Sequence, residues 1–340
     1  MRKIQIKGKV AACFGVAIGL LMASSWTSCK NTKQNDETDT IAAQKPLGPD
    51  FNADSAYSFC AAQCGFGARV MNSKAHDLCE QWIIDKFRSF GCIVSTQKTT
   101  VNGYDGTPLR CTNIIARFRP EASRRILLCA HWDSRPWADN DPDSTQWRKP
   151  VMGANDGASG VAVMLEIARL LKADSTLRIG IDFVCFDAED YGTPQWSSLP
   201  ADESSWALGA QYWAKNIPSG YKAAYGIVLD MVGGQGATFY QEGYSKQYAG
   251  SIVDKFWNAA HAIGYSSYFP IADGGFITDD HDPVNKYAQI PTIDIVPYYP
   301  NCAESAFGPT WHTVSDDMAH IDRNTLKAVG QTLLHVLFSE

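Results

Sequence analysis

Residues 179–190 read IGIDFVCFDAED, and this stretch carries the strongest indication of the fold. Its part up to Phe186 is almost entirely apolar. A short apolar run of this kind is typical of a strand that is buried on both faces of a parallel sheet. Three carboxylates follow the run at once, at Asp187, Glu189 and Asp190. Because ligand sites in parallel sheets lie beyond the carboxyl ends of the strands, this acidic segment marks the expected site.

The chain alternates strands and helices on both sides of this run. Further strands are expected at residues 109–118, 125–130, 223–230 and 292–296. Helices are expected where apolar side chains recur at helical spacing, at residues 53–65, 73–90, 161–172, 207–215, 248–263 and 325–338. This alternation predicts an α/β fold with a mostly parallel central β-sheet flanked by helices on both faces. We expect one catalytic domain over residues 52–340.

The N-terminus has the features of an export signal. Four cations and no acids lie in residues 1–28, and the apolar run 10–22 within them is too short to span a bilayer stably. Small residues then lead to Cys29, as in a lipoprotein signal peptide, although Trp26 departs from that pattern and leaves simple secretion as the alternative. Polar residues 29–51 are expected to form a tether. The protein is therefore expected to be exported, and to be periplasmic or anchored to the outer membrane only through a lipid on Cys29.

Charge and cysteine content argue against two other classes of function. The formal net charge is −6, which disfavours a nucleic-acid partner because such proteins need a basic face. The sequence has no Cys-x-x-Cys pair, so a zinc site built from cysteines is not expected. Cys129 and Cys185 lie in apolar runs, and we expect them to be buried free thiols.

Five connections deliver histidine or carboxylate side chains to one edge of the predicted sheet. They carry His131 and Asp133, then Asp156, then Glu189 and Asp190, then Asp230, and finally His312. Each residue alone has an ordinary explanation, such as a helix N-cap for Asp156. Their joint occurrence at strand ends favours a metal site, because they supply the mixture of oxygen and nitrogen ligands that zinc takes in open catalytic sites.

Common nucleophile and phosphate motifs are missing from the sequence. It contains no Gly-x-Ser-x-Gly elbow, no P-loop and no Gly-x-Gly-x-x-Gly fingerprint. A metal that activates water or substrate is therefore the favoured chemistry.

The order and spacing of these residues resemble the zinc aminopeptidase superfamily, and within it the sequence looks most like the glutaminyl-peptide cyclotransferases, or glutaminyl cyclases. Three features carry this likeness: Asp279-Asp280-His281 before the last strand, Trp311 directly before His312, and Trp196 shortly after the acidic pair. The resemblance implies a zinc-aminopeptidase-like fold of the phosphorylase/hydrolase type. It also implies conversion of N-terminal glutamine in peptides or proteins to pyroglutamate, with release of ammonia.

Roles for individual residues follow from the resemblance alone. It implies that Asp156, Asp190 and His312 bind one zinc ion per chain, with Asp190 standing where the animal enzymes carry Glu. Glu189 would be the proton shuttle. Asp230 and Asp279 would belong to a neighbouring acidic network. The walls of the substrate pocket would be Trp196, Trp311 and Phe307. His131 and Asp133 would support the ligands from behind.

Two alternatives from other classes stay open. In a di-zinc aminopeptidase, His131 and Asp230 would hold a second metal, Asp156 would bridge the two ions, and Glu189 would activate a water. All these positions carry competent residues, so the sequence does not exclude this activity. A non-enzymatic binding protein on the same scaffold is the other alternative, although such a protein would not need Glu189.

Overall fold

The computed structural model describes residues 43–340. The predicted signal peptide over residues 1–28, Cys29 and most of the predicted tether lie outside the described residues. Residues 43–340 form one compact unit. Its first residues pack on the helices that follow, since the Gln44 amide donates to the Ala262 carbonyl at 2.7 Å and Phe51 is buried. The compact unit thus begins earlier than the expected boundary at residue 52. Among the described residues, no helix combines the length and the apolar character needed to cross a membrane.

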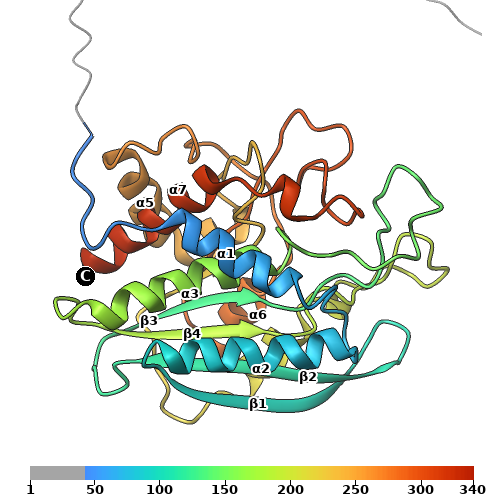
Figure 1. Cartoon of the computed structure of the whole chain (residues 1–340), viewed down its shortest axis with the longest axis horizontal. Helices are drawn as coiled ribbons and strands as arrows, with labels where there is room; N and C mark the ends of the chain where they lie inside the picture. The colour runs from blue at the N-terminus through green and yellow to red at the C-terminus, as the bar shows by residue number, and fades with distance from the viewer. Residues whose placement is uncertain (1–42) are drawn as a thin grey trace, which may run out of the picture. The chain divides into compact units, whose positions relative to one another are not determined.

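The central sheet of the described residues has six strands in the order β1-β2-β4-β3-β5-β6. Figure 1 shows the first four of this order, β1, β2, β4 and β3, side by side. The strands are β1 (Ile93–Asn102), β2 (Pro108–Phe118), β3 (Arg125–His131), β4 (Gly180–Phe186), β5 (Gly226–Leu229) and β6 (Thr292–Ile295). Neighbours among β4, β3, β5 and β6 are parallel, whereas β1 and β2 are joined to them by antiparallel pairs. The prediction of a mostly parallel sheet is confirmed.

Strand β1 was not expected from the sequence. Its residues read IVSTQKTTVN, and this sequence shows no regular alternation of apolar and polar side chains. In the structure no residue of the strand is fully buried. The strand exists because it pairs with β2 along its whole length, from Ile93 opposite Arg117 to Asn102 opposite Pro108. Its β-branched threonines and valines suit an edge strand that only a tertiary partner can stabilise.

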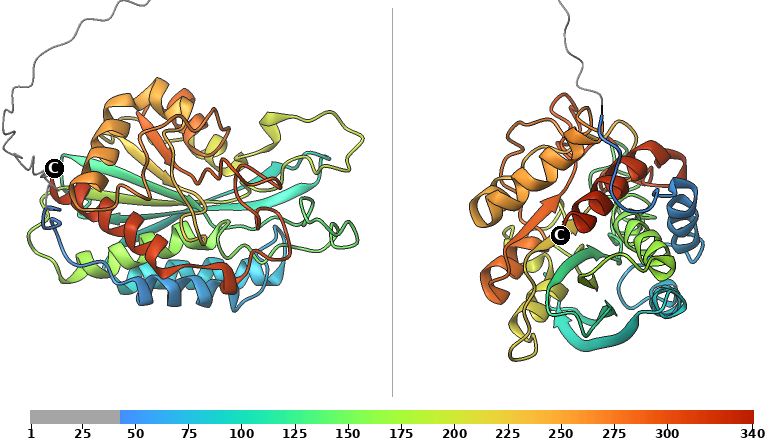
Figure 2. Two further views of the ribbon diagram at one scale, coloured as in Figure 1. Left: turned by 90° about the horizontal axis from the view of Figure 1, so that it is seen from above. Right: turned by 90° about the vertical axis from the view of Figure 1, so that its left-hand side faces the viewer.

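Helices cover both faces of the sheet. They are α1 (Ala53–Cys64), α2 (Lys74–Ser89), α3 (Ala158–Ala173), α4 (Leu208–Lys215), α5 (Gly243–Ala262), α6 (His281–Pro283) and α7 (Arg323–Phe338). Alternate residues of β3 point to opposite layers: Ile126 and Leu128 join the core beneath α1, α2, α3, α5 and α7, whereas Leu127 and Cys129 join the core beneath α4. Figure 2 shows α1, α2 and α3 together on one side of the sheet.

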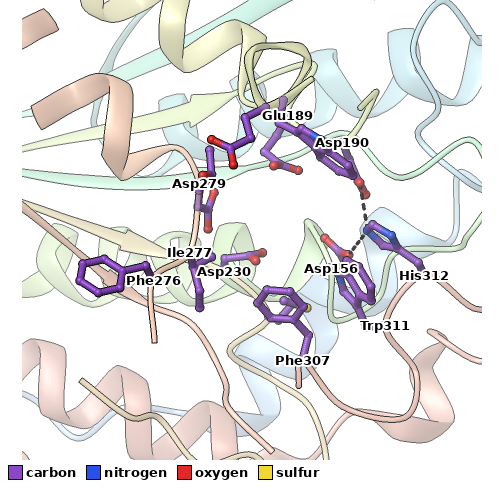
Figure 3. Close-up of a pocket in the computed structure, with 14 residues that line it drawn as sticks. Asp156, Glu189, Asp190, Asp230, Phe276, Ile277, Asp279, Phe307, Trp311 and His312 are labelled. Atoms are coloured by element: carbon purple, nitrogen blue, oxygen red, sulfur yellow. Dashed lines mark ion pairs between the residues drawn. The ribbon is translucent and has the colours of Figure 1, made fainter. Parts of the chain in front are cut away.

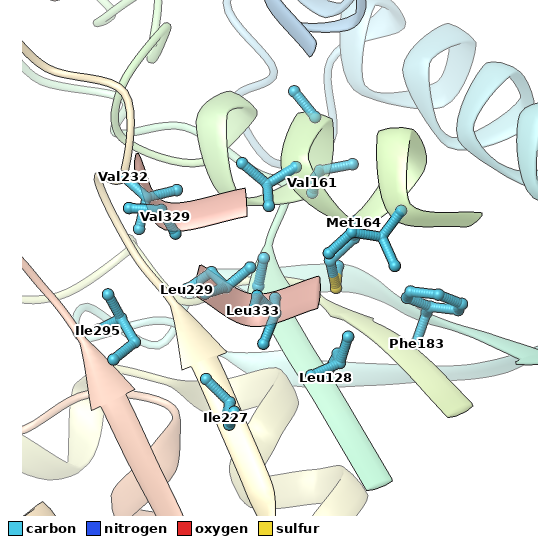
Figure 4. Close-up of a cluster of buried hydrophobic side chains, with 14 of the residues drawn as sticks. Leu128, Val161, Met164, Phe183, Ile227, Leu229, Val232, Ile295, Val329 and Leu333 are labelled. Carbon is cyan, nitrogen blue, oxygen red and sulfur yellow. The ribbon is translucent and has the colours of Figure 1, made fainter. Parts of the chain in front are cut away.

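The larger core layer ties the helices to the parallel strands (Figure 4). In it, Val161 and Met164 of α3 and Leu333 of α7 are fully buried together with Leu128 and Ile227 of the sheet. Each such side chain contributes about 1.5–3 kcal/mol on burial. This packing fixes the carboxyl ends of the strands, and therefore the residues that follow them.

Helix α3 begins three residues before the expected start, immediately after the loop that carries Asp156. Gly157 permits this early start because its φ is +100° and a Cβ there would lie 2.3 Å from the Asp133 carbonyl oxygen. At Gly160 a Cβ would lie 2.2 Å from the Leu229 carbonyl oxygen, so only glycine lets α3 approach β5 so closely.

All eight cysteines of the described residues are free, and Cys129 and Cys185 are buried as predicted.

Candidate active site

A pocket of about 350 Å³ lies beyond the carboxyl ends of the parallel strands (Figure 3). It is lined by Asp156, Glu189, Asp190, Glu203, Trp206, Asp230, Met231, Phe276, Ile277, Thr278, Asp279, Phe307, Trp311 and His312. The lining includes every residue that the sequence predicted as metal ligand or catalytic group. It also includes two of the three predicted aromatic walls.

Strained backbone turns aim several of these side chains into the pocket. Ala188, Met231 and His312 all have φ near +50°, a region that residues other than glycine seldom adopt. Ala188 precedes Glu189, Met231 follows Asp230, and His312 is itself a predicted ligand. Each such residue costs about 1–3 kcal/mol, and this strain persists only where surrounding contacts enforce it.

Carboxylates behind the pocket supply some of those contacts. Asp133 accepts hydrogen bonds from the backbone amides of Glu189 at 3.1 Å and Asp190 at 3.2 Å. Asp316 accepts from the amide of Asp156 at 3.1 Å. Asp133 therefore supports the site as predicted, whereas the part played by Asp316 was missed, because nothing in the sequence places it beneath the Asp156 loop.

Two buried arginines that the sequence did not single out also fix this region. Arg69 donates to the carbonyls of Trp132 at 3.0 Å, Met152 at 2.7 Å and Gly153 at 2.6 Å, so it joins the loops that carry His131 and Asp156. An isolated arginine in a sequence gives no signal of this kind, since its partners are backbone carbonyls far along the chain.

The second buried arginine, Arg135, lies beside a predicted ligand. Its Nη1 is 3.6 Å from Asp190 Oδ1 and donates to the Asp190 carbonyl at 3.0 Å. Arg135 also donates to Asp139 at 2.7 Å and to the Gly192 carbonyl at 3.2 Å, and its guanidinium stacks 4.6 Å from the ring of Trp206. Arg135 thus brings a fixed positive charge to the edge of the site.

Asp156, Asp190 and His312 form a cluster whose potential ligand atoms all lie within 4.8 Å of one another. His312 Nε2 is 3.1 Å from Asp190 Oδ1 and 3.6 Å from Asp156 Oδ2. Both carboxylate oxygens of Asp190 are buried, yet neither accepts a hydrogen bond from a described residue. Burial, with the charge of Arg135 as the next cause, lowers the pKa of His312 to about 3, which keeps its imidazole neutral. Two carboxylates and a neutral imidazole that converge in this way fit a zinc ion.

His131, Asp156 and Asp230 form a second cluster with the same span. His131 Nε2 lies 3.0 Å from Asp156 Oδ1 and 3.1 Å from Asp230 Oδ1, and its Nδ1 lies 3.5 Å from Asp133 Oδ1. Burial alone would lower the pKa of His131, but these three carboxylates raise it well above its ordinary value. These carboxylates therefore favour the protonated form of the His131 imidazole.

Glu189 lies in the pocket beside the acidic groups of both clusters. Burial raises its pKa well above the ordinary value, and the negative charges of Asp190 and Asp279 act in the same direction while His131 opposes them. Burial likewise raises the pKa of Asp230 to about 7. Asp230 can therefore exchange protons near neutral pH, and the upward shift of the Glu189 pKa is in the direction that general acid–base catalysis requires.

Aromatic rings form the walls around the ligand cluster. Trp311 stacks on His312 with centroids 3.8 Å apart, and Phe307 lies 5.0 Å from Trp311. Both residues therefore line the pocket as predicted. Trp206 lies parallel to His312 on another side, at 6.0 Å and an interplanar angle of 7°.

The prediction that Trp196 forms a wall of this pocket is wrong. Its ring stacks on Trp147 at 6.2 Å and carries the guanidinium of Arg148 at 4.1 Å, and it is not among the lining residues. Trp206 takes that position instead. Both tryptophans belong to one loop after the acidic pair, and their spacing in sequence does not reveal which ring turns inward.

Comparison with known proteins agrees with this geometry. Residues 113–337 match Peptidase family M28, and the chain belongs to this family. A glutaminyl cyclase of Bacteroides thetaiotaomicron, solved with N-acetylhistamine bound, shares 50% sequence identity and a TM-score of 0.84, covering 86% of this chain and 99% of that one.

One solved structure of similar identity is named as an exopeptidase, and a curated glutaminyl-peptide cyclotransferase is more distant. A Zn-dependent exopeptidase from Parabacteroides distasonis has 49% identity and a TM-score of 0.83, covering 86% of this chain and 99% of that one. The glutaminyl-peptide cyclotransferase of Bos taurus is 25% identical over 246 residues, which is 65% of this chain and 64% of the relative. The chain thus matches less than two thirds of this curated relative's length. The predicted fold and the resemblance to glutaminyl cyclases are confirmed, and zinc is supported as the metal.

Proposed function

We propose that the protein is a zinc-dependent glutaminyl-peptide cyclotransferase with one zinc ion per chain. It converts the N-terminal glutamine of peptides or proteins to pyroglutamate and releases ammonia. The observation that carries the proposal is the position of half-buried Glu189 beside the Asp156, Asp190 and His312 cluster, in a pocket walled by aromatic rings. The likeness to glutaminyl cyclases over most of the chain supports it.

The reaction needs little more than proton transfer and polarisation. The α-amine of the substrate forms a bond to its own side-chain amide carbon, and the bond from that carbon to the amide nitrogen breaks. Zinc held by Asp156, Asp190 and His312 supplies a Lewis acid for the amide carbonyl oxygen. Because the nucleophile and the amide belong to one residue, the substrate itself provides their proximity.

Glu189 handles the protons in this scheme. Its carboxylate accepts a proton from the attacking amine, and the resulting carboxyl group donates a proton to the leaving nitrogen, which departs as ammonia. Both transfers require a pKa nearer neutrality than that of an ordinary glutamate, and burial with the neighbouring Asp279 shifts the pKa in that direction. The rings of Trp206, Trp311 and Phe307 exclude water, which would otherwise hydrolyse the amide.

A di-zinc aminopeptidase is the second candidate, because His131, Asp156 and Asp230 also converge within 4.8 Å. The ion pairs of His131 favour the cyclase. His131 Nε2 lies 3.0 Å from Asp156 Oδ1 and 3.1 Å from Asp230 Oδ1, so a second metal would have to replace both of these ion pairs.

Mass spectrometry of two peptides tests the proposal. One peptide begins with Gln and the other with Leu, and each is incubated with the purified protein and with a chelator-treated sample. Loss of ammonia from the Gln peptide alone, abolished by the chelator and restored by zinc, is the expected result, with about one zinc per chain by metal analysis. Removal of the Leu residue, with about two zinc ions per chain, would establish the aminopeptidase instead.

We also propose that the protein is exported and anchored to a membrane through a lipid on Cys29, after removal of residues 1–28. The cations, the short apolar run and the small residues before Cys29 support this. Mass analysis of the mature N-terminus, beside a Cys29→Ser variant, tests it. A lipid mass on Cys29 is expected, and an unmodified N-terminus would replace anchoring with simple secretion.

A further inference from the structure

Four consecutive residues, from Phe276 to Asp279, line the pocket and become more buried along the chain. Phe276 is 68% exposed, Ile277 and Thr278 are half-buried, and Asp279 is only 4% exposed. This segment therefore runs from the protein surface to the acidic floor of the pocket. Figure 3 places Phe276 and His312 on opposite sides of the pocket.

The exposed ring of Phe276 lies against the first residues of α5. It packs edge-on against Tyr244 with centroids 5.0 Å apart. Its other neighbour is Gly243, where a Cβ would come within 2.7 Å of the Phe276 ring, so only glycine leaves room for it. The next residue, Ile277, donates its amide to Glu242 at 3.1 Å, which ties the segment to the start of α5.

Phe276 is an exposed aromatic ring at the edge of the pocket, and such a ring can contact the part of a ligand that extends out of the pocket. Contiguous exposed apolar surface often marks a site of interaction, and here Phe276 packs on Tyr244 and is followed by Ile277. A ring that already packs on a neighbour loses less conformational entropy when a partner covers it. Ile277 beside it extends the apolar surface into the pocket.

The dimensions match a bound peptide. From Asp279 to Phe276 the segment spans at most about 10 Å, at 3.3–3.6 Å per extended residue. If the N-terminal side chain reaches the ligand cluster, the rest of the peptide leaves through the mouth. The second residue then lies one residue length further out, at the level of Ile277 and Phe276.

We infer that Phe276 contacts the side chain of the second residue of the substrate, and that the protein prefers an aromatic or large aliphatic residue there. This inference rests on the proposed function, which places the N-terminal glutamine in the pocket. It deepens that function by naming the substrate class: peptides with glutamine first and an apolar residue second.

Comparison of two peptides tests the inference. The value of kcat/KM is measured for Gln-Phe-Ala and Gln-Ala-Ala with the full-length protein, the Phe276→Ala variant and a matched Ile271→Ala control. Ile271 is also a large exposed side chain, at 62%, but it does not line the pocket. The unaltered protein is expected to prefer the Phe peptide by about 5-fold, the usual strength of an aromatic pair.

In the Phe276→Ala variant this ratio should fall to about one, whereas Ile271→Ala should keep it, by the same pair-contact argument. The change should lie mainly in KM, because the contact is the same in the ground and transition states. Phe276→Leu should keep part of the preference, which separates lost contact from misfolding. A ratio near one in the unaltered protein, or an unchanged ratio in Phe276→Ala, overturns the inference. If neither peptide is cyclised by the unaltered protein, it is the proposed function that fails.

Discussion

The two ligand clusters share Asp156 and have the same span, yet the pKa values of their histidines are shifted in opposite directions. His312 lies 3.5 Å from Asp139, 3.6 Å from Asp156 and 3.1 Å from Asp190, yet burial, with the charge of Arg135 as the next cause, lowers its pKa to about 3. His131 faces three carboxylates, which raise its pKa well above the ordinary value. The same residue types at the same spacing therefore carry opposite pKa shifts at their histidines. The groups around each cluster, and not its own composition, set the direction of the shift.

Replacing each histidine in turn gives the largest expected effects. His312→Gln should abolish zinc binding and lower kcat/KM by at least about 10,000-fold, because the metal supplies several kcal/mol of transition-state stabilisation. His131→Gln should keep about one zinc per chain and lose only about 10- to 100-fold, as is usual for a supporting group. Metal analysis and kinetics on both variants, beside the half-exposed His320→Gln as control, measure this. Loss of zinc in His131→Gln would show that His131 also helps to bind metal, and would favour the two-metal alternative.

The next largest effect is expected when Glu189 is replaced. Glu189→Gln should lower kcat by about 1,000-fold while the zinc content stays unchanged, since the amide can neither accept nor donate the transferred proton. Single-turnover kinetics and metal analysis on one sample separate the two quantities. Full activity in this variant would remove Glu189 from the mechanism.

His281 is another buried histidine, and it belongs to neither ligand cluster. Its ion pair therefore allows the effect of charge on stability to be measured apart from metal binding. His281 Nε2 lies 3.1 Å from Glu242, which also caps α5 through the amides of Tyr244 and Ser245. Burial opposes ionisation of Glu242, but His281 and these amides together lower its pKa to about 2. The stabilisation by this carboxylate is therefore complete above about pH 4.5 and is lost as the pH falls toward 2.

Glu242→Gln should accordingly lower the free energy of unfolding by about 2 kcal/mol at pH 7, and by less at pH 3. Urea unfolding at both pH values measures the difference, with the exposed Glu121→Gln as matched control. An equal loss at the two pH values would show that shape and capping matter, rather than charge.

The smallest expected effect separates the two tryptophans of one loop. Trp206→Ala should lower kcat/KM by about 5-fold, because its ring covers His312 and forms part of the pocket wall. Trp196→Ala should change kcat/KM by less than about 2-fold, since that ring packs on Trp147 and Arg148 outside the pocket. Steady-state kinetics with a Gln peptide compares them. The reverse order of effects would place Trp196 against the substrate after all.

Much of the fold follows from local pattern. Apolar runs such as 179–186 have the length and composition of strands buried on both faces, and helical spacing located α2, α3 and α7 to within a few residues. Strand β1 was missed because its sequence is polar and only pairing with β2 makes it a strand. Helix α5 begins earlier than expected, at Gly243, because the side chain of Glu242 caps its first turn.

The sequence by itself determined which residues meet at the site. Parallel strands end at one edge of a sheet, so His131, Glu189 and Asp230, which end or follow three of them, had to converge. Only the tertiary structure decided how these groups are charged and held. Arg69 and Arg135 act through carbonyls and carboxylates far along the chain, and Trp206 rather than Trp196 turns inward. The physical reason is that pKa and orientation depend on burial and on distances of a few ångströms between groups, which spacing along the chain does not encode.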